Sequence, residues 1–584
     1  MSNKTPLRPA RVEVSGQVDH AVAYDGPGTH RLGPLVLDIT GEPPGRLAWR
    51  VRNEGDQPIA IRALSVVFRL EPAEAPIRMF RQGYQSWSGS GVAVFGEDRD
   101  PSNLPGAFEF IQGFHHADQR TARPGELRSE LVTVVRCGSA EPFLVGFEGS
   151  SRHDGTLRLR PADGSPELWA EAFLGDASLP AGAERPLHPV AISEGGDAST
   201  LLEQWADRVG EVEGARRDAP YQVGWCPWYH YFHDATETDI RANLAACRDW
   251  PMGTFQVDDA YQRAIGDWLT TNDRFPSGVA SLAADIAGAG FAPGIWLAPF
   301  LAAPDSEVAQ AHGDWLARSP QGDQPLPGMF EPKWSAAAGG LIHTLDTTHP
   351  DVLAHLERLA RELRSQGWQY FKLDFTMAPS FDGVFHDPTR TPAERVRAGY
   401  DAFRRGAGDE AFILGCGAPI GHVIGAVDGN RIGSDVAPTW GLGADTPPLG
   451  PYASAAPATR HGLRDLITRS FMHRKLWLND PDCILLRRTQ TSLSDAQRRT
   501  WAHAVGLSGG MALVSDDMAL LGKAERALFD EVLELGRASD EAARKGSPAR
   551  CPDLLDRPVP AHLTSAAGYI EASYETGESA MERA

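Results

Sequence analysis

Two short segments in the second half of the chain each place a carboxylate near a cation, a combination that could support covalent catalysis. In YFKLDF, Asp374 follows Lys372 by two positions, so both side chains point to the same face of a regular strand. A neighbouring ammonium keeps a carboxylate ionised, and an ionised, desolvated carboxylate can attack an anomeric carbon. The alternative is a structural ion pair between Lys372 and Asp374 at the end of the strand.

The second segment is RIGSD, in which Asp435 follows Arg431 by four positions. A retaining glycoside hydrolase needs a second carboxyl about 5 to 5.5 Å from its nucleophile, acting first as general acid and then as general base. Asp435 could fill that role beside Asp374. A surface ion pair between Arg431 and Asp435 is the other interpretation of this spacing.

Asp258 and Asp259 are adjacent in FQVDDAY. In a regular strand only one of them could point into a pocket, so the chain must turn there if both are to face a ligand. Two acceptor carboxylates suit sugar hydroxyls. A divalent metal site is the competing interpretation, but clustered His and Glu partners are missing from these motifs, so we expect neither a metal nor another cofactor.

Aromatic side chains accompany the carboxylates. The candidates are Trp87, Trp225, Trp228, Tyr229, Tyr231, Trp296 and Trp440. A flat apolar ring fits the C–H face of a pyranose. We expect the rings at strand ends to contact a ligand and the others to pack in the core.

These motifs follow apolar segments that have the length of buried strands. The segments are 223–226, 255–257, 291–297, 370–375, 412–414, 430–432, 476–478 and 511–514. Eight strands alternating with helical stretches over roughly 320 residues predict a (β/α)₈ TIM barrel of the α/β class, in which reactive groups collect at the carboxyl ends of the strands. Among the helices, residues 349–367 place Val352, Leu356, Leu359 and Leu363 on one face.

The barrel is predicted to occupy residues 199–540. Residues 1–198 contain short alternating segments separated by Gly, Pro and Asp, which is typical of an N-terminal β-sandwich domain. The small polar stretch SEGGDAST precedes the change of pattern near residue 199. Residues 541–584 are predicted to form a short C-terminal β appendage.

Composition narrows the range of partners. The 584 residues carry a formal net charge of -21, so the chain as a whole repels phosphate backbones and anionic lipids, and we expect neither nucleic acid nor membrane as a partner. The six cysteines lack CxxC spacing and are interpreted as reduced thiols. The first residues contain no continuous apolar stretch of a signal peptide, which favours a cytoplasmic location.

GxxxxGKS and GxGxxG motifs are absent from the sequence. Instead, from Tyr84 to Asp517 the chain resembles the α-galactosidases (melibiases) of glycoside hydrolase family 36, through the ordered segments GWCPWYHYF, FQVDD, GIWLAPF, YFKLDF, GCGAP, RIGSD and WLNDPDC. The resemblance implies that Asp374 is the nucleophile and Asp435 the general acid/base. It implies further that the galactosyl ring is held by Asp258, Asp259, Lys372, Cys416 and Arg431, with Trp87 reaching over from the sandwich in YQSWSG and Tyr229 lining the same pocket. Trp296 joins this set as a strand-end aromatic.

Three features depart from the family pattern: Ala260 replaces the glycine of DDG, Leu297 stands where a smaller or polar residue is common, and the C-terminal region is short. The short C-terminal region favours a monomer or small homo-oligomer. The expected activity is retaining hydrolysis of terminal α-linked galactose, with small-molecule substrates such as melibiose and raffinose-type sugars. Alternatives are an α-N-acetylgalactosaminidase, a raffinose-synthase-like galactosyl transferase and a non-catalytic carbohydrate-binding protein, and Cys416 near the 2-substituent favours galactose.

Overall fold

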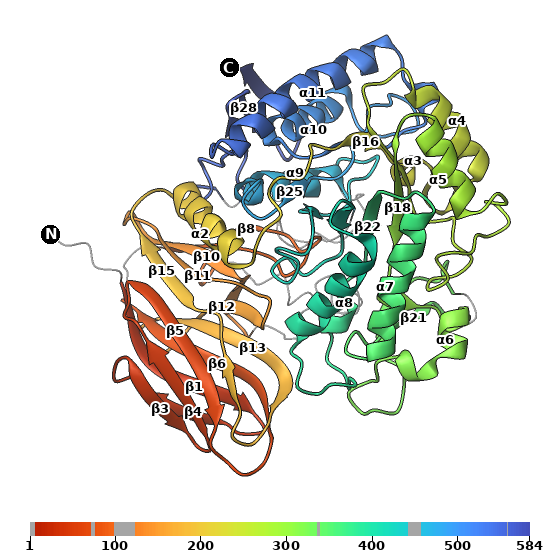
Figure 1. The fold of residues 1–584 in the computed structure, drawn as a ribbon. Helices are drawn as coiled ribbons and strands as arrows, with labels where there is room; N and C mark the ends of the chain where they lie inside the picture. The colour runs from red at the N-terminus through yellow and green to blue at the C-terminus, as the bar shows by residue number, and fades with distance from the viewer. Residues whose placement is uncertain (1–5, 72–75, 98–122, 336–338, 442–456, 558) are drawn as a thin grey trace.

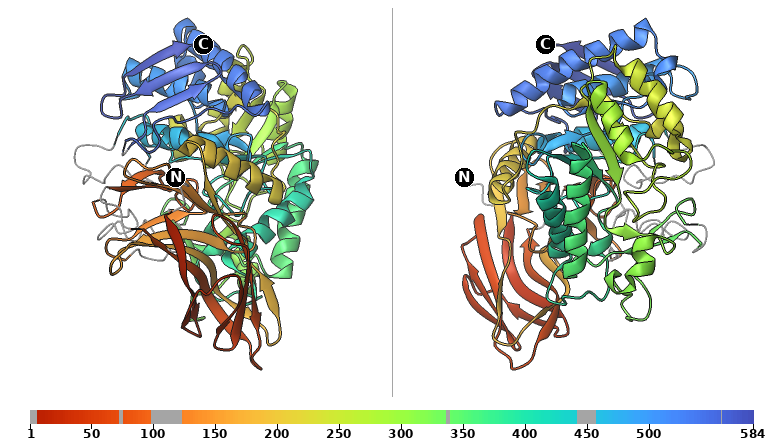
Figure 2. Two further views of the ribbon diagram at one scale, coloured as in Figure 1. Left: turned by 90° about the vertical axis from the view of Figure 1, so that its left-hand side faces the viewer. Right: turned by 45° about the vertical axis from the view of Figure 1, so that its right-hand side comes forward.

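The computed structural model describes residues 6–71, 76–97, 123–335, 339–441, 457–557 and 559–584. The N-terminal strands and the last three strands lie at opposite ends of the molecule, with a parallel barrel between them (Figures 1 and 2). Within the described ranges, no helix combines the length and the apolar character needed to cross a lipid bilayer.

The N-terminal region is built from two antiparallel sheets, in agreement with the predicted sandwich. The first sheet contains β1 (Leu7–Gly16), β2 (His20–Ala23), β6 (Ile59–Leu70), β9 (Leu127–Glu130), β12 (Asp154–Arg160) and β13 (Glu167–Leu179). The second contains β3 (Gly28–Leu32), β4 (Leu35–Thr40), β5 (Gly45–Asn53), β7 (Ile77–Arg81), β8 (Gly91–Val94), β10 (Val132–Cys137), β11 (Phe143–Phe147), β14 (Glu184–Pro186) and β15 (Val190–Glu194). Along β5, Leu47, Trp49 and Val51 are buried while their neighbours are more exposed, the alternation that a sheet covered on one face requires.

Eight parallel strands form the predicted barrel. In chain order they are β16 (Val223–Trp225), β17 (Thr254–Val257), β18 (Ala292–Leu297), β22 (Tyr370–Leu373), β23 (Phe412–Gly415), β24 (Gly429–Arg431), β25 (Leu478–Asp480) and β26 (Ala512–Val514). Neighbouring strands pair from β16 to β25, and β26 pairs with β16. An isolated bridge joins Val514 of β26 to Ile484, four residues after the end of β25. The strand residues are buried almost without exception because parallel strands are covered on both faces.

The seventh strand begins two residues later than predicted, at Leu478 instead of Leu476. It therefore includes Asn479 and Asp480, which pair in register with Asn430 and Arg431 of β24. An apolar pattern could not identify these positions as strand, because the buried polar side chains are stabilised by contacts across the sheet. The guanidinium of Arg431 donates to Asp480 at 3.2 Å.

Helices surround the barrel. They are α2 (Ala198–Val212), α3 (Trp228–Tyr231), α4 (Glu237–Cys247), α5 (Val279–Gly288), α6 (Glu307–Ala311), α7 (Pro350–Ser365), α8 (Pro392–Ala407), α9 (Thr459–Thr468), α10 (Asp495–Ser508) and α11 (Lys523–Arg544). The predicted helix at 349–367 is confirmed as α7: His349 caps its first turn, proline occupies the first helical position, and the four predicted apolar residues are buried.

The C-terminal strands begin later than the boundary at residue 540 suggests. Helix α11 continues to Arg544, and Ala543 in its last turn is still buried, so the same helix crosses the predicted boundary. Strands β27 (His562–Ser565), β28 (Gly568–Ala572) and β29 (Ser579–Arg583) then form a small antiparallel sheet. This sheet packs against α10, as the contacts of β27 and β28 show.

Candidate active site

A pocket lies where the carboxyl ends of the barrel strands meet the N-terminal region. The space among its lining atoms, open solvent included, is about 450 Å³. It is lined by Trp87, Trp228, Tyr229, His233, Asp258, Asp259, Trp296, Met329, Glu331, Trp334, Lys372, Asp374, Phe375 and Asp435. Eight of the ten predicted site residues are among them; Cys416 and Arg431 are buried behind this wall.

Asp374 follows the last residue of β22 and is only 6% exposed. Its Oδ2 accepts a hydrogen bond from the Trp296 indole at 3.0 Å, and its Oδ1 accepts one from the Phe375 backbone at 2.8 Å. Two donors therefore fix the carboxylate in one orientation. Burial raises the pKa of Asp374 above its ordinary value, while the nearby Lys372 ammonium and the two donors oppose that shift.

The predicted direct pairing of Lys372 with Asp374 is wrong. The Lys372 ammonium donates to Asp258 Oδ2 at 2.9 Å instead. Asp258 follows β17, and β18 lies between β17 and β22, so the long lysine side chain reaches across the intervening strand. Burial alone lowers the pKa of Lys372, but the acidic groups around it, of which Asp258 contributes most, together outweigh burial and raise that pKa well above its usual value. Lys372 acts on Asp374 from a distance, as a charge.

Asp435 has a different environment. Arg431 Nη1 donates to Asp435 Oδ1 at 2.8 Å. The Arg431 side chain is 3% exposed, whereas that of Asp435 is 28% exposed, so this pair is not a surface ion pair. Of these two carboxylates, Asp374 is therefore buried and Asp435 keeps contact with solvent.

Both Asp258 and Asp259 line the pocket, as two adjacent residues can do only where a strand ends and the chain turns. The turn occurs at Ala260, whose φ is 115°, a conformation that favours glycine. Asp259 accepts hydrogen bonds from Gln262 Nε2 at 2.6 Å and from the Trp334 indole at 2.9 Å. The glycine missing from this motif thus costs backbone strain without preventing the turn.

Trp87 comes from the connection between β7 and β8, and the barrel holds this connection in place. Arg469 is fully buried and donates to the carbonyl oxygens of Ser86 at 2.9 Å and Ser88 at 2.6 Å. The backbone of Ser86 also donates to the Ala418 carbonyl at 3.0 Å. The N-terminal region can therefore supply a ring to the pocket at a fixed position.

The ring of Trp87 meets Phe375 edge to face at a centroid distance of 5.0 Å. Gly417 makes this approach possible, because a Cβ there would lie 2.9 Å from the Trp87 ring and 2.9 Å from the Phe375 nitrogen. Cys416 precedes it and is buried, its backbone donating to Leu373. The segment GCGAP thus shapes the wall behind Asp374.

The other aromatic candidates divide between pocket and core. Trp228, Tyr229 and Trp296 line the pocket with Trp87. Trp225 stacks on Phe255 below it, Tyr231 accepts from Asn243, and Trp440 donates to the backbone of Tyr574 in the C-terminal region. These three rings serve packing and hydrogen bonding within the protein.

Sequence reasoning missed five lining residues: His233, Met329, Glu331, Trp334 and Phe375. Met329 belongs to β20 (Pro327–Phe330), which with β19 (Leu301–Ala302) and β21 (Leu341–Thr344) forms a small sheet inserted between β18 and α7; Glu331 and Trp334 follow β20 directly. For Met329, Glu331 and Trp334 the signal was the length of the segment between strands three and four, which exceeds the requirement of a simple βα unit. Length shows an insertion but not where it folds.

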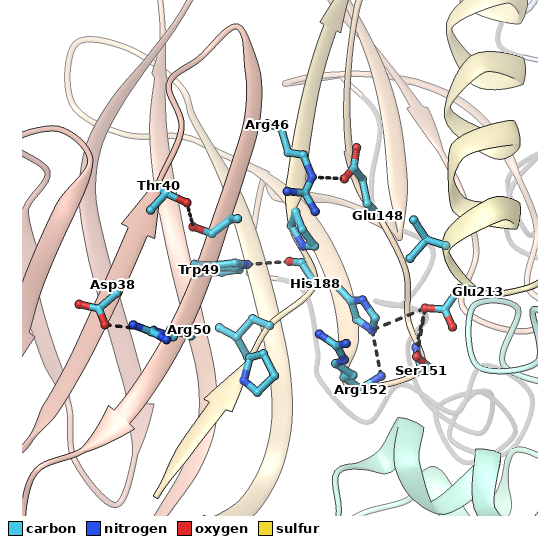
Figure 3. Close-up of a pocket in the computed structure, with 15 residues that line it drawn as sticks. Asp38, Thr40, Arg46, Trp49, Arg50, Glu148, Ser151, Arg152, His188 and Glu213 are labelled. Carbon is cyan, nitrogen blue, oxygen red and sulfur yellow. Dashed lines mark hydrogen bonds and ion pairs between the residues drawn. The ribbon is translucent and has the colours of Figure 1, made fainter.

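A larger and more open cleft, of about 1040 Å³, lies on the N-terminal sandwich (Figure 3). Its charges are largely paired with each other: Arg46 bonds Glu148 at 2.5 Å and Arg50 bonds Asp38 at 3.2 Å. Trp49 is 4% exposed and its indole donates to the His188 carbonyl, so its ring face is not offered to a ligand. This cleft is larger, but the carboxylates and aromatic rings that line the barrel pocket make that pocket the better candidate for the functional site.

Comparison with known proteins agrees with the position of this pocket. Residues 226–379, which include Asp258, Asp259 and Asp374, match the family model described as Melibiase. Over these residues the chain is similar to the melibiases. The α-galactosidase AgaA of Geobacillus stearothermophilus is 32% identical over 133 residues, 21% of this chain and 18% of that protein. An α-galactosidase of Escherichia coli is 31% identical over 78 residues, 12% of this chain and 11% of that protein, so the chain aligns with less than a fifth of these relatives' length.

Among solved structures, an α-galactosidase from Thermus thermophilus in complex with stachyose is 25% identical to this chain, with a TM-score of 0.64. The match covers 85% of this chain and 97% of that one. The family 36 α-galactosidase AgaA from Geobacillus stearothermophilus, at 13% identity and a TM-score of 0.62, shares the fold over 98% of this chain and 78% of its own.

Proposed function

We propose that this protein is a retaining, exo-acting α-galactosidase with Asp374 as nucleophile and Asp435 as general acid/base. The observation that carries the proposal is the asymmetry of the two carboxylates in one pocket. Asp374 is buried and oriented by two donors, as a nucleophile requires, whereas Asp435 is paired with Arg431 and partly exposed, as a group that exchanges protons requires. The relationship to the melibiases supports the same assignment.

In the proposed mechanism Asp374 attacks C1 of the galactosyl ring while Asp435 protonates the leaving oxygen. The bond from C1 to the leaving oxygen breaks and an ester to Asp374 forms. Asp435, now ionised, takes a proton from water, and the resulting oxygen attacks C1 and releases Asp374. The anomeric configuration is retained because two inversions occur.

The lining explains how a single terminal ring could be bound. Asp258 and Asp259 offer acceptors for sugar hydroxyls, and Lys372 offers a donor. Trp87 and Trp296 provide apolar faces for the C–H surface of the ring. Melibiose and raffinose-type oligosaccharides, which end in α-linked galactose, are the proposed substrates.

The test is release of p-nitrophenol from its α-galactoside, compared with the α-N-acetylgalactosaminide, the β-galactoside and the α-glucoside. We expect selective turnover of the first, with α-galactose as the first product in a proton NMR time course. Asp374→Ala should lose at least about a thousandfold in kcat, because loss of a covalent nucleophile removes several kcal/mol of transition-state stabilisation.

Chemical rescue by azide gives a second test of the nucleophile. In Asp374→Gly, azide could enter the vacated space and attack C1 directly, which would give β-galactosyl azide by a single inversion. A wild-type product of inverted configuration, or an Asp374→Ala variant with more than about a tenth of wild-type rate, would contradict the proposed nucleophile.

A further inference from the structure

Asp482 lies behind the pocket wall, in the segment that follows β25. Its side chain is fully buried, and it does not line the pocket. Its φ is 90°, a backbone conformation that costs an aspartate about 1 to 3 kcal/mol and that surrounding contacts must maintain. The groups that bond to its carboxylate show which parts of the site Asp482 holds in place.

The first contacts are with the immediate surroundings of Asp435. Asp482 Oδ2 accepts a hydrogen bond at 2.8 Å from the backbone nitrogen of Val436, the residue after Asp435. Asp482 Oδ1 lies 2.8 Å from Nη2 of Arg431, whose Nη1 bonds Asp435. One buried carboxylate therefore fixes both the backbone beside Asp435 and the cation that pairs with it.

The third contact is with the pocket wall. The hydroxyl of Tyr229, which follows β16 in α3, donates to Asp482 Oδ2. The Tyr229 ring lines the pocket, and its backbone nitrogen is held by the Ser515 hydroxyl at 2.9 Å. Asp482 thus joins three parts of the barrel that are distant in sequence.

Around Asp482, carboxyl groups outnumber the cations that could pair with them. The groups facing Asp482 are Arg431, Asp435, Asp480, Tyr229 and Cys483. Three carboxyl groups therefore share the guanidinium of Arg431. Burial raises the pKa of Asp482 to about 7; Arg431 opposes this shift, and Asp435 and Asp480 add to it. The charge of Asp435 therefore contributes to the raised pKa of Asp482.

We propose that Asp482 is a positioning residue that holds Asp435 in place and sets the charge balance around Arg431, the cation with which Asp435 pairs. This inference rests on the proposed function of Asp435. The proposed mechanism needs Asp435 protonated in the first step and ionised in the second. A neighbouring carboxylate whose own protonation responds to Asp435 reduces the cost of that change of charge.

The variant Asp482→Asn tests the proposal because it keeps the shape of the side chain and removes its charge. A negative charge beside an acid favours the acid's protonated form, so removal of that charge favours loss of the proton. The alkaline limb of the kcat/KM profile, which reports loss of the acid's proton, should move to lower pH by about 1 unit. A variant that only loosened the fold would lower activity without moving this limb.

A comparison of leaving groups sharpens the test. A sugar alkoxide needs protonation to depart, whereas p-nitrophenolate departs with little assistance from an acid. Asp482→Asn should therefore lose at least about tenfold more kcat/KM on melibiose than on p-nitrophenyl α-galactoside. In Asp435→Ala, which has no acid to position, adding Asp482→Asn should have little further effect on the activated substrate.

Asp540→Asn is the matched control. Asp540 is also buried and bonded to an arginine, Arg474 at 2.6 Å, but it lies outside the pocket. It should lower thermal stability and leave the alkaline limb and the ratio of the two substrates unchanged. Should Asp482→Asn fail to fold, Tyr229→Phe removes one donor to the same carboxylate and should move the limb in the same direction by less.

The outcomes separate this inference from the proposed function. A wild-type enzyme without turnover of any α-galactoside would refute the function itself. An active wild type, with a folded Asp482→Asn variant whose alkaline limb is unmoved and whose losses on the two substrates are equal, would overturn the role of Asp482 alone.

Discussion

Replacing Trp296 with phenylalanine should separate orientation of Asp374 from packing of the pocket wall. The phenyl ring preserves most of the apolar surface and removes the indole N–H that lies 3.0 Å from Asp374 Oδ2. A hydrogen bond to a charged group contributes about 1.5 to 3 kcal/mol, and about 1.4 kcal/mol corresponds to one pKa unit. The pKa of Asp374 in the free enzyme should therefore rise by about 1 to 2 units.

The sign follows from which form the indole stabilises. The N–H donates to the ionised carboxylate, so its loss favours the protonated form and raises the pKa of Asp374, which burial already raises. The acid limb of kcat/KM should move to higher pH by the same amount. Below that limb the variant should be slower than wild type by about 10- to 100-fold, and the plateau should fall by less.

Trp268→Phe provides the control for this change. The Trp268 ring packs edge to face on Trp296 at 5.7 Å, and Trp268 does not line the pocket. It alters the packing of the same wall and leaves the donor to Asp374 intact, so its acid limb should coincide with that of wild type. The reasoning is refuted if Trp296→Phe lowers the plateau without moving the acid limb, or if both variants shift it equally.

Three further predictions concern stability and the inserted sheet. Ala260→Gly relieves a φ of 115° that costs about 1 to 3 kcal/mol, against about 0.4 to 1 kcal/mol of added unfolded-state entropy, so the urea midpoint should rise; an unchanged or lower midpoint would count against strain at this turn. Trp334→Phe removes a donor to Asp259, and it should raise KM for p-nitrophenyl α-galactoside several-fold more than it lowers kcat. The pKa of Asp540 is depressed well below its usual value: burial raises it, but His473 and Arg474 outweigh burial. This contribution to stability is present above about pH 4 and is lost as the pH falls further, so acid unfolding followed by circular dichroism should be less steep in Asp540→Asn.

The sequence by itself determined which residues meet at the pocket. Strands and helices alternate from residue 223 onward, and parallel strands in a barrel present their carboxyl ends at one face. Polar residues directly after those strands, among them Asp258, Asp374 and Asp435, must therefore converge. This conclusion needed only local periodicity and the rule that parallel barrel strands end at one face. The difference of two residues at the start of β25 did not alter it.

Only the tertiary structure decided which charges pair. Two residues apart on one strand, Lys372 and Asp374 share a face, yet the ammonium reaches Asp258 because a long side chain can cross an intervening strand. Arg431 likewise contacts Asp480 and Asp482 as well as the predicted Asp435. Pairing between ions depends on distances of a few ångströms across the barrel, and sequence spacing along one strand does not contain that information.

The walls contributed by other segments also required the structure. Trp334 follows a strand inserted in a long connection, and Trp87 reaches the pocket because Arg469 and the backbone near Ala418 hold its loop. Such segments have no periodic relation to the barrel strands. Their positions result from hydrogen bonds between residues distant in sequence, 75 positions apart for Trp334 and Asp259 and 383 for Arg469 and Ser86, which form only when the chain has folded.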